Sequence, residues 1–464
     1  MPVFHEEHHS AAPPPGRDPY SAFRVREYTL YTVGSFIAVV GRQMVGMVVA
    51  YEIHARTHSA TALGLIGLAA ALPIIFLALP AGQAADRVDR RGLIMASQAL
   101  NLLTSVALAL LSLQAAAIPT WPVLNWSSEI LQSLAIHLGE KHGTVFGPEI
   151  PLFFLLLLLN GTVRTFGWAA RAPFISNLVP RSVLANAITW NSSLFEIACI
   201  VGPAAGGLLM AHFGYPFVYF LDAAASVVFM GFLLRVSPQA KVHTAPEHPF
   251  ANLLSGVRFV LSTKVIFATI TLDLFAVLLG GATALLPIFA DDILMVGAAG
   301  IGWLRAAQSI GAITMALALA HLPPMRRAGS ALLWAVAGFG CATILFGLSR
   351  NYWLSLAALA LAGACDNISV VVRHTLVQLL TPDSMRGRVA AVNNIFIGSS
   401  NELGAFESGL TAALIGPVRS VVVGGIGTIL VVLGVAAKWP QVRKIGSLTT
   451  LLPEDAAAGQ NPGT

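Results

Sequence analysis

The chain has 464 residues, of which 56% are hydrophobic and only 11% are charged, and its mean hydropathy is +0.75. About a quarter of the residues in a typical soluble domain are charged, so too few polar side chains remain here to cover a soluble core of this size. The net charge of +5 requires no nucleic-acid partner, because anionic lipid headgroups are a natural counter-surface for cationic loops.

Apolar runs of about 20 residues, each long enough to cross ~30 Å of hydrocarbon, recur along nearly the whole chain. They predict an all-α polytopic membrane protein with twelve transmembrane helices. The expected segments are 27–54, 61–82, 92–117, 151–176, 185–211, 214–236, 265–290, 298–321, 329–349, 352–377, 388–416 and 418–438.

The remaining segments are expected to be tails and connections. Residues 1–26 and 439–464 are expected to form polar tails, and the first is expected to contain no cleavable signal peptide. Its cluster His5, Glu6, Glu7, His8 and His9 is interpreted as a solvated tail, with weak metal binding as the alternative. The linker 237–264 contains an amphipathic stretch at 250–261 that is expected to lie along the membrane surface. The 118–150 connection is long and lies on the opposite side.

The distribution of lysine and arginine predicts the orientation. With the N-terminus inside, 18 of the 27 fall in cytoplasmic segments. The outer loops hold four, which are Arg56, Lys141, Arg350 and Arg419. Because cationic loops resist translocation, both termini are predicted to be cytoplasmic.

The chain also contains a weak internal repeat. Residues 171–208 align without gaps on residues 373–410, an offset of 202, and eight of these 38 positions are identical. The identities include Arg171 with Arg373 and Gly207 with Gly409. A duplicated six-helix unit, giving halves 27–236 and 265–438, explains the repeat. Chance similarity among apolar helices is the alternative.

A charged loop between the second and third segments reads Gly82-Gln-Ala-Ala-Asp86-Arg87-Val-Asp89-Arg90-Arg91. It resembles the signature loop of the major facilitator superfamily (MFS), G-x3-D-R-x-G-R-R. The resemblance implies two pseudo-symmetric six-helix halves and a latch that shuts the cytoplasmic side in one conformation. The matching positions are Gly82, Asp86, Arg87, Arg90 and Arg91.

Two details of this loop lead to expectations about its structure. Gly82 lacks a Cβ atom and is expected to let the second helix approach a neighbour closely. Asp89 stands at the family's second glycine, so the turn there must be built differently. The alternative to a latch is a basic loop that only fixes the orientation of the chain in the membrane. Asp86, however, contributes nothing to that orientation.

The fifth segment contains the run Gly202-Pro203-Ala-Ala-Gly206-Gly207. Proline bends a helix, and glycines let a partner helix pack against its backbone. The run resembles the G-x3-G-P-x2-G-G signature of MFS exporters, with Ala198 at the first glycine, and therefore implies outward transport. An ordinary kinked helix is the alternative. The stretches 164–173 and 400–410 further resemble the enterobactin-exporter-like branch, often called transmembrane secretion effectors.

Several ionisable residues fall inside predicted spans, where each costs on the order of 2.5–3.5 kcal/mol and needs a reason. Helices 1, 4, 7 and 10 line the central cavity of the MFS fold, and helices 5, 8 and 11 border it. The resemblance therefore implies a set of cavity-facing candidates for substrate binding or proton coupling: Arg42, Arg164, Glu196, Asp273, Arg305, Asp366 and Glu402. The carboxylates could carry protons as access alternates, or the opposite charges could simply pair and hold the halves together. Asp222 is expected to be structural.

These features favour a secondary active transporter that exports an amphipathic small molecule, such as a siderophore or a drug, in exchange for protons. Arg42 and Arg164 suit an anionic group on that molecule. The alternatives are a lysophospholipid flippase, a metal exporter using His374, or a non-transporting receptor or assembly factor.

No G-x4-G-K-[ST] phosphate loop and no Ser/His/Asp grouping positioned for catalysis is found in the sequence. We therefore expect no enzyme activity, no cofactor, no metal and no use of ATP. The expected partners are the small-molecule substrate and the lipid bilayer, and no nucleic acid. The protein is expected to be a monomer in the inner membrane of a bacterium.

Overall fold

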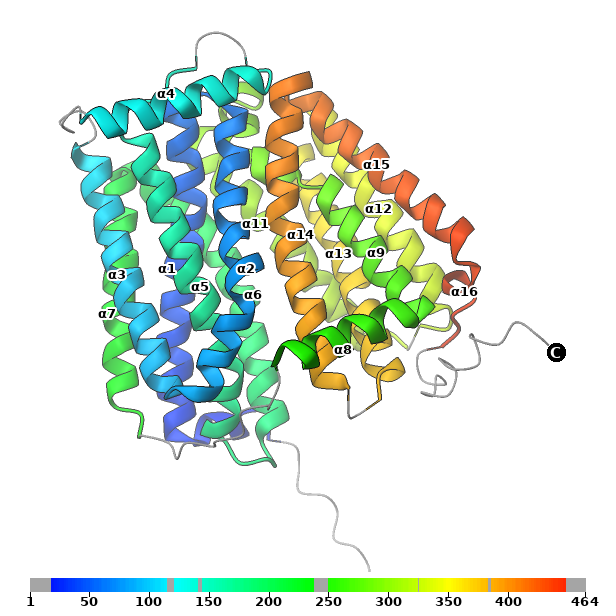
Figure 1. The fold of residues 1–464 in the computed structure, drawn as a ribbon. Coiled ribbons are helices and arrows are strands. Elements are labelled where there is room, and N and C mark those ends of the chain that lie inside the picture. The colour runs from blue at the N-terminus through cyan, green and yellow to red at the C-terminus, as the bar shows by residue number, and fades with distance from the viewer. Residues whose placement is uncertain are drawn as a thin grey trace, which may run out of the picture.

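The computed structural model describes residues 18–114, 121–140, 144–237, 249–323, 325–382 and 385–447. Long helices dominate these residues, and no strand occurs among them (Figure 1). The first group of helices comprises α1 (Arg26–Thr57), α2 (Ala60–Arg87), α3 (Arg90–Gln114), α4 (Pro122–His137), α5 (Ile150–Leu178), α6 (Leu184–Phe213) and α7 (Tyr215–Leu234), after a 3-10 turn, η1 (Ser21–Arg24).

The second group begins with α8 (Pro249–Ser262) and α9 (Lys264–Leu279). The long helices that follow are α11 (Gly297–His321), α12 (Ala328–Leu348), α13 (Tyr352–Leu380), α14 (Arg386–Ile415) and α15 (Pro417–Lys438), with a short final helix, α16 (Pro440–Arg443). The tail cluster 5–9 lies outside the described residues.

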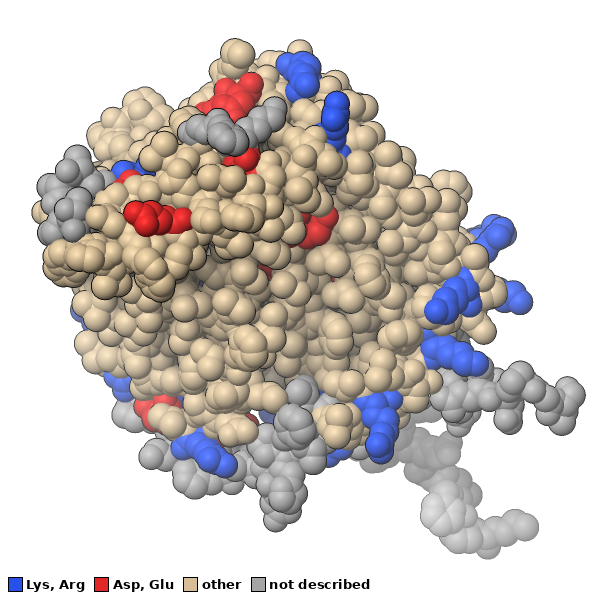
Figure 2. All heavy atoms as spheres, turned by 45° about the horizontal axis from the view of Figure 1, so that its top comes forward, with Lys and Arg blue, Asp and Glu red and all other residues tan. Residues whose placement is uncertain are grey.

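The predicted twelve-helix architecture is confirmed. Eleven spans of the described chain are long and apolar enough to cross a membrane. The twelfth is α14, which is 30 residues long but carries a polar run at 399–402. Charged side chains lie toward the two ends of the molecule and leave a broad uncharged belt between them (Figure 2). This belt is what the hydrocarbon core of a bilayer requires.

The seventh predicted segment is broken, whereas the sequence predicted a continuous helix over 265–290. After α9 the chain passes through Gly280 and Gly281 into three short turns, η3 (Ala282–Leu285), α10 (Leu286–Ile288) and the π-helical η4 (Phe289–Ile293). A Cβ atom on Gly281 would lie 2.7 Å from the carbonyl oxygen of Gly404 in α14. The glycine pair therefore interrupts the helix and lets the turn pack closely on its neighbour.

Two helices lie across the ends of the bundle. The predicted loop 118–150 contains α4, which begins with Pro122 at its first turn, a favourable place for proline. The stretch predicted to be amphipathic forms α8, at the opposite end of the molecule (Figure 1). We call these two ends the α4 face and the α8 face. The α8 face also carries the turn between α2 and α3, and it is the face predicted to be cytoplasmic.

The long helices pack as two groups that lie side by side (Figure 1). Helices α1, α2, α3, α5, α6 and α7 pack on one another, as do α9, α11, α12, α13, α14 and α15. We call these groups the first half and the second half. They meet mainly where α2 packs on α14 and where α6 packs on α11. Any site shared by the halves must therefore lie between these two crossings.

Candidate substrate site between the two halves

An ion pair joins the two halves midway along their helices. Arg164 of α5 donates from Nη2 to Oε1 of Glu402 in α14 over 2.6 Å. The side chains are 34% and 23% exposed, so water reaches both of them. The structure thus brings together two of the candidates predicted from the sequence, one from each half.

Two further candidates border the same space. Arg305 of α11 and Glu196 of α6 are exposed although each lies well inside its helix. Arg305 is within electrostatic range of Glu402 and Cys199, and Glu196 is within range of Asp366. Since these neighbours belong to different halves, Arg305 and Glu196 face the space between the halves.

Arg42 of α1 lies on the wall that the first half contributes. Its charged neighbours are Arg171, Asp222 and Arg164. Asp222 is buried in α7, where its Oδ2 atom accepts hydrogen bonds from Asn101 and Ser105 of α3. The Nε atom of Arg42 is buried and has no hydrogen-bond partner among the described residues. Positive charge on this wall is therefore only partly compensated.

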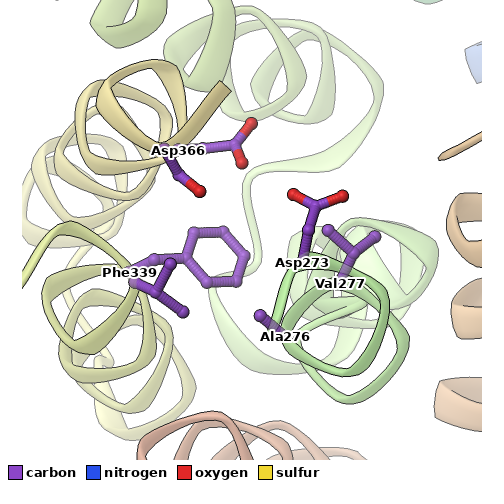
Figure 3. Close-up of a pocket in the computed structure, with 7 residues that line it drawn as sticks. Asp273, Ala276, Val277, Phe339 and Asp366 are labelled. Carbon is purple, nitrogen blue, oxygen red and sulfur yellow. The ribbon is translucent and has the colours of Figure 1, made fainter. Parts of the chain in front are cut away.

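The second half contains a separate acidic pocket. Asp273 of α9 pairs with Arg373 of α13 over 2.7 Å, and both side chains are buried. Asp366, two turns before Arg373, shares a small pocket with Asp273, Phe339 and Ser369. The two carboxylates extend from facing helices into the same space (Figure 3). Within the described chain, Asp366 has no ion pair and no hydrogen bond through its side chain.

Arg373 was missed as a site residue, although the repeat contained a signal for it. The offset of 202 that pairs Arg171 with Arg373 also pairs Arg164 with Asp366. The equivalent helices α5 and α13 thus carry an arginine at the same position near the α8 face. Two helical turns earlier, at the paired positions 164 and 366, the first half has an arginine where the second half has an aspartate.

The glycines of the exporter-like motif lie at helix crossings. Gly202 and Gly206 pack against α1. A Cβ atom on Gly207 would lie 2.7 Å from the carbonyl oxygen of Ala298 and 2.9 Å from the Cα atom of Gly302, both in α11. Its repeat partner, Gly409 of α14, packs in the same way on Gly64 of α2. Both crossings between the halves are therefore glycine-on-glycine contacts, which allow backbones to approach closely.

Polar contacts also join the halves near the α4 face, and sequence reasoning missed them. The Tyr51 hydroxyl donates to Oδ1 of Asp291 over 2.6 Å. His54 Nε2 lies 3.6 Å from Oδ2 of Asp292. Both aspartates belong to the π-helical turn η4, which the prediction of a continuous helix concealed.

The predicted latch loop makes no such connection. Among the described residues Asp86 has no ion pair, and a Cβ atom on Gly82 would meet nothing within 4 Å. The close approach expected at Gly82 is therefore absent from this conformation. Arg90 donates to the Ala85 carbonyl and Arg91 to the Leu234 carbonyl, both within the first half, while Arg87 is exposed.

The turn at Asp89 is built by a cap in place of the family's glycine. The Asp89 carboxylate accepts hydrogen bonds from the backbone N–H groups of Arg91 and Gly92, at 3.3 and 2.9 Å. It thereby satisfies donors in the first turn of α3 and places a negative charge at the positive end of the helix. No group of three or more His, Cys, Asp or Glu side chains placed to hold a metal ion occurs in the described part of the chain.

This arrangement, two helical halves around a charged central space, defines a membrane transporter. The family model for the Major Facilitator Superfamily matches residues 31–405, and the chain belongs to that superfamily. The enterobactin exporter EntS of Escherichia coli O1:K1 is 27% identical over 397 residues, which cover 85% of this chain and 88% of the relative. The same exporter from Shigella flexneri is 28% identical, with 85% and 87% covered. The predicted resemblance to the enterobactin-exporter-like branch is confirmed.

Solved structures share the fold. A D-xylose-proton symporter aligns with a TM-score of 0.66 at 12% identity, over 92% of this chain and all of the other. A bacterial homologue of the human lysosomal transporter Spinster, solved in an inward-facing conformation, aligns with a TM-score of 0.65 at 13% identity, over 91% and 99% of the two chains. At these identities the likeness establishes the fold alone.

Proposed function

We propose that this transporter exports an amphipathic small molecule, of the siderophore or drug kind, by alternating access and in exchange for protons. The observation that carries the proposal is the Arg164–Glu402 ion pair, which places reachable opposite charges from both halves at mid-membrane. The named function of the EntS relatives, enterobactin export, supports the outward direction. The exporter-like glycine motif at the α6–α11 crossing supports it as well.

In this proposal the substrate enters from the α8 face. The halves are joined near the α4 face by glycine contacts and by the Tyr51–Asp291 hydrogen bond, whereas the latch loop at the α8 face is unengaged. With the α8 face in the cytoplasm of a bacterial cell, as the distribution of basic residues predicts, this is the loading conformation of an exporter. The transporter acts as a monomer in the inner membrane.

Asp366 is our candidate for the proton carrier. Asp273 is already neutralised by Arg373, so its protonation would break a buried ion pair. Asp366 has no such partner among the described residues and lines a pocket beside Asp273. It can therefore take up and release a proton without loss of an existing ion pair.

The experiment is accumulation of a panel of dyes, drugs and catecholate siderophores in efflux-deficient bacteria that express the protein. We expect at least one compound to accumulate less, and a protonophore or the Asp366→Asn substitution to abolish the effect. Glu129→Gln, on the exposed side of α4, is the matched control and should export normally. Unchanged accumulation of every compound, with the protein confirmed in the membrane, would reject export. Protonophore-insensitive export would reject proton exchange.

A further inference from the structure

One side of α5 carries two arginines and a tryptophan on successive turns. Arg164, Trp168 and Arg171 are spaced by four and then three residues, so they lie along the same side of the helix. The ion pair of Arg164 with Glu402 shows that Arg164 faces the second half, whereas the guanidinium of Arg171 lies over the Phe229 ring of α7, 6.0 Å from its centroid. Trp168 is 57% exposed and packs edge-on against Phe195 of α6, with ring centroids 6.0 Å apart. We call these three residues the α5 stripe.

Positive charge gathers around the α5 stripe, and one of its two arginines, Arg171, has a buried Nε atom without an acceptor among the described residues. Arg42 lies within electrostatic range of both Arg164 and Arg171, and Asp222 is the acidic side chain that partly compensates its charge. The Nε atoms of Arg42 and Arg171 are buried without a hydrogen-bond partner in the described part of the chain. A buried donor left without an acceptor is destabilising, and an anion bound between these arginines would supply the missing acceptor.

Glu402 occupies this position in the present conformation. Within the described residues, Glu402 is the one carboxylate at ion-pair distance from any of these three arginines, and the arginine that it contacts is Arg164. It belongs to the second half and lies beside the α2–α14 crossing, where a Cβ atom on Gly67 would lie 2.6 Å from its carbonyl oxygen. The ion pair of Glu402 thus has two consequences: it satisfies Arg164, and it ties the halves together midway along their helices.

We propose that aromatic acids are the substrate class of this transporter, and that their acid group displaces Glu402 from Arg164. The acid group then binds between Arg164, Arg171 and Arg42, while the ring lies against the exposed face of Trp168. The displacement removes an ion pair between the halves and thereby favours opening of the α4 face. This inference rests on the proposed export function and deepens it.

The test is equilibrium binding of salicylate, an aromatic acid, to the purified protein in lipid nanodiscs, with its neutral amide, salicylamide, as the matched ligand. Glu402→Gln should bind salicylate about tenfold more tightly than the wild type, because the internal competitor has lost its charge. Arg164→Gln and Arg171→Gln should each bind it about tenfold more weakly, for loss of a charge-assisted hydrogen bond. Binding of salicylamide should not respond to any of the three substitutions.

Two controls separate the site from general effects. Glu407→Gln removes a partly buried carboxylate from the same helix and should leave salicylate binding unchanged. Trp168→Phe should bind as the wild type does, whereas Trp168→Ala should lose affinity. Unchanged or weaker binding by Glu402→Gln, or no salicylate binding by any variant, would overturn the inference. The accumulation experiment decides the export function independently of this result.

Discussion

The two faces of this transporter are held in opposite ways. At the α4 face the halves touch through paired glycines, Gly64 with Gly409 and Gly207 with Gly302, and through the Tyr51–Asp291 hydrogen bond. At the α8 face the predicted latch residue Asp86 has no ion pair among the described residues, and Gly82 faces open space.

Closure of the α4 face therefore does not depend on the charged signature loop. Close backbone packing closes the α4 face, and such packing is all-or-none because interiors tolerate little change of volume. The charged loop is free to form its contacts in the alternate conformation. The two faces therefore respond to different kinds of substitution.

The largest effect is expected from adding a methyl group at a crossing. Gly207→Ala and Gly409→Ala each place a Cβ atom against the backbone of the other half, and such overpacking costs about 1–3 kcal/mol, or roughly 5–150-fold in an equilibrium. We expect the α4 face to open more often, which thiol labelling from outside the cell would measure. We also expect export to fall, which a transport assay would measure. Gly231→Ala, in α7, is the control, since nothing lies within 4 Å of the added atom. Equal labelling and equal transport in all three variants would refute closure of the α4 face by the glycine contacts.

A smaller effect is expected from the polar contacts at the same face. Tyr51→Phe and Asp291→Asn each remove or weaken one hydrogen bond, whose net contribution is about 0.5–1.5 kcal/mol where water has access. Labelling at the α4 face should increase in both variants. The double variant should be no worse than the more severe single one, since both remove the same bond. Strictly additive effects would show that the two residues act separately.

At the α8 face, Asp89→Ala should destabilise the first turn of α3 by about 1 kcal/mol, the typical value of a helix cap. The measurement is the thermal midpoint of the detergent-solubilised protein. Asp89→Asn, which keeps one oxygen to accept the shorter of the two bonds, from the Gly92 N–H group, should recover part of the loss. A midpoint for Asp89→Ala equal to that of the wild type would contradict the capping role.

The smallest stability change is expected at Asp86. Because Asp86 makes no ion pair here, Asp86→Asn should alter the thermal midpoint of this conformation by no more than surface substitutions do, about 0.5 kcal/mol. Export should nevertheless fall if Asp86 acts in the other conformation. A large loss of stability would place its contact in the present conformation and contradict the open latch.

Eleven of the twelve spans are long apolar runs, a signal that needs no tertiary information, so the sequence was sufficient to locate them. It failed at α4 and at the turns after α9, where short elements are fixed by packing. Pro122 and the pair Gly280–Gly281 were visible signals for those elements.

For the candidate site, too, the sequence identified residues but not the contacts between them. Charge inside the spans pointed to Arg164, Glu402, Asp273 and Asp366, because charges there need a reason. Their pairing could not be read from the sequence, since Arg164 and Glu402 are 238 residues apart. Arg373 was noticed only as a repeat identity, and its depth and its partner required the packed helices.

The most direct test of alternating access is a pair of distance measurements by electron spin resonance during export of the substrate. One pair of spin labels replaces the exposed residues Val88 and Leu322 at the α8 face, and the other replaces Val123 of α4 and Arg350 at the α4 face. Substrate should shorten the first distance and lengthen the second in the same fraction of molecules. A protein that exports its substrate while both distances stay constant would contradict alternating access between these two faces.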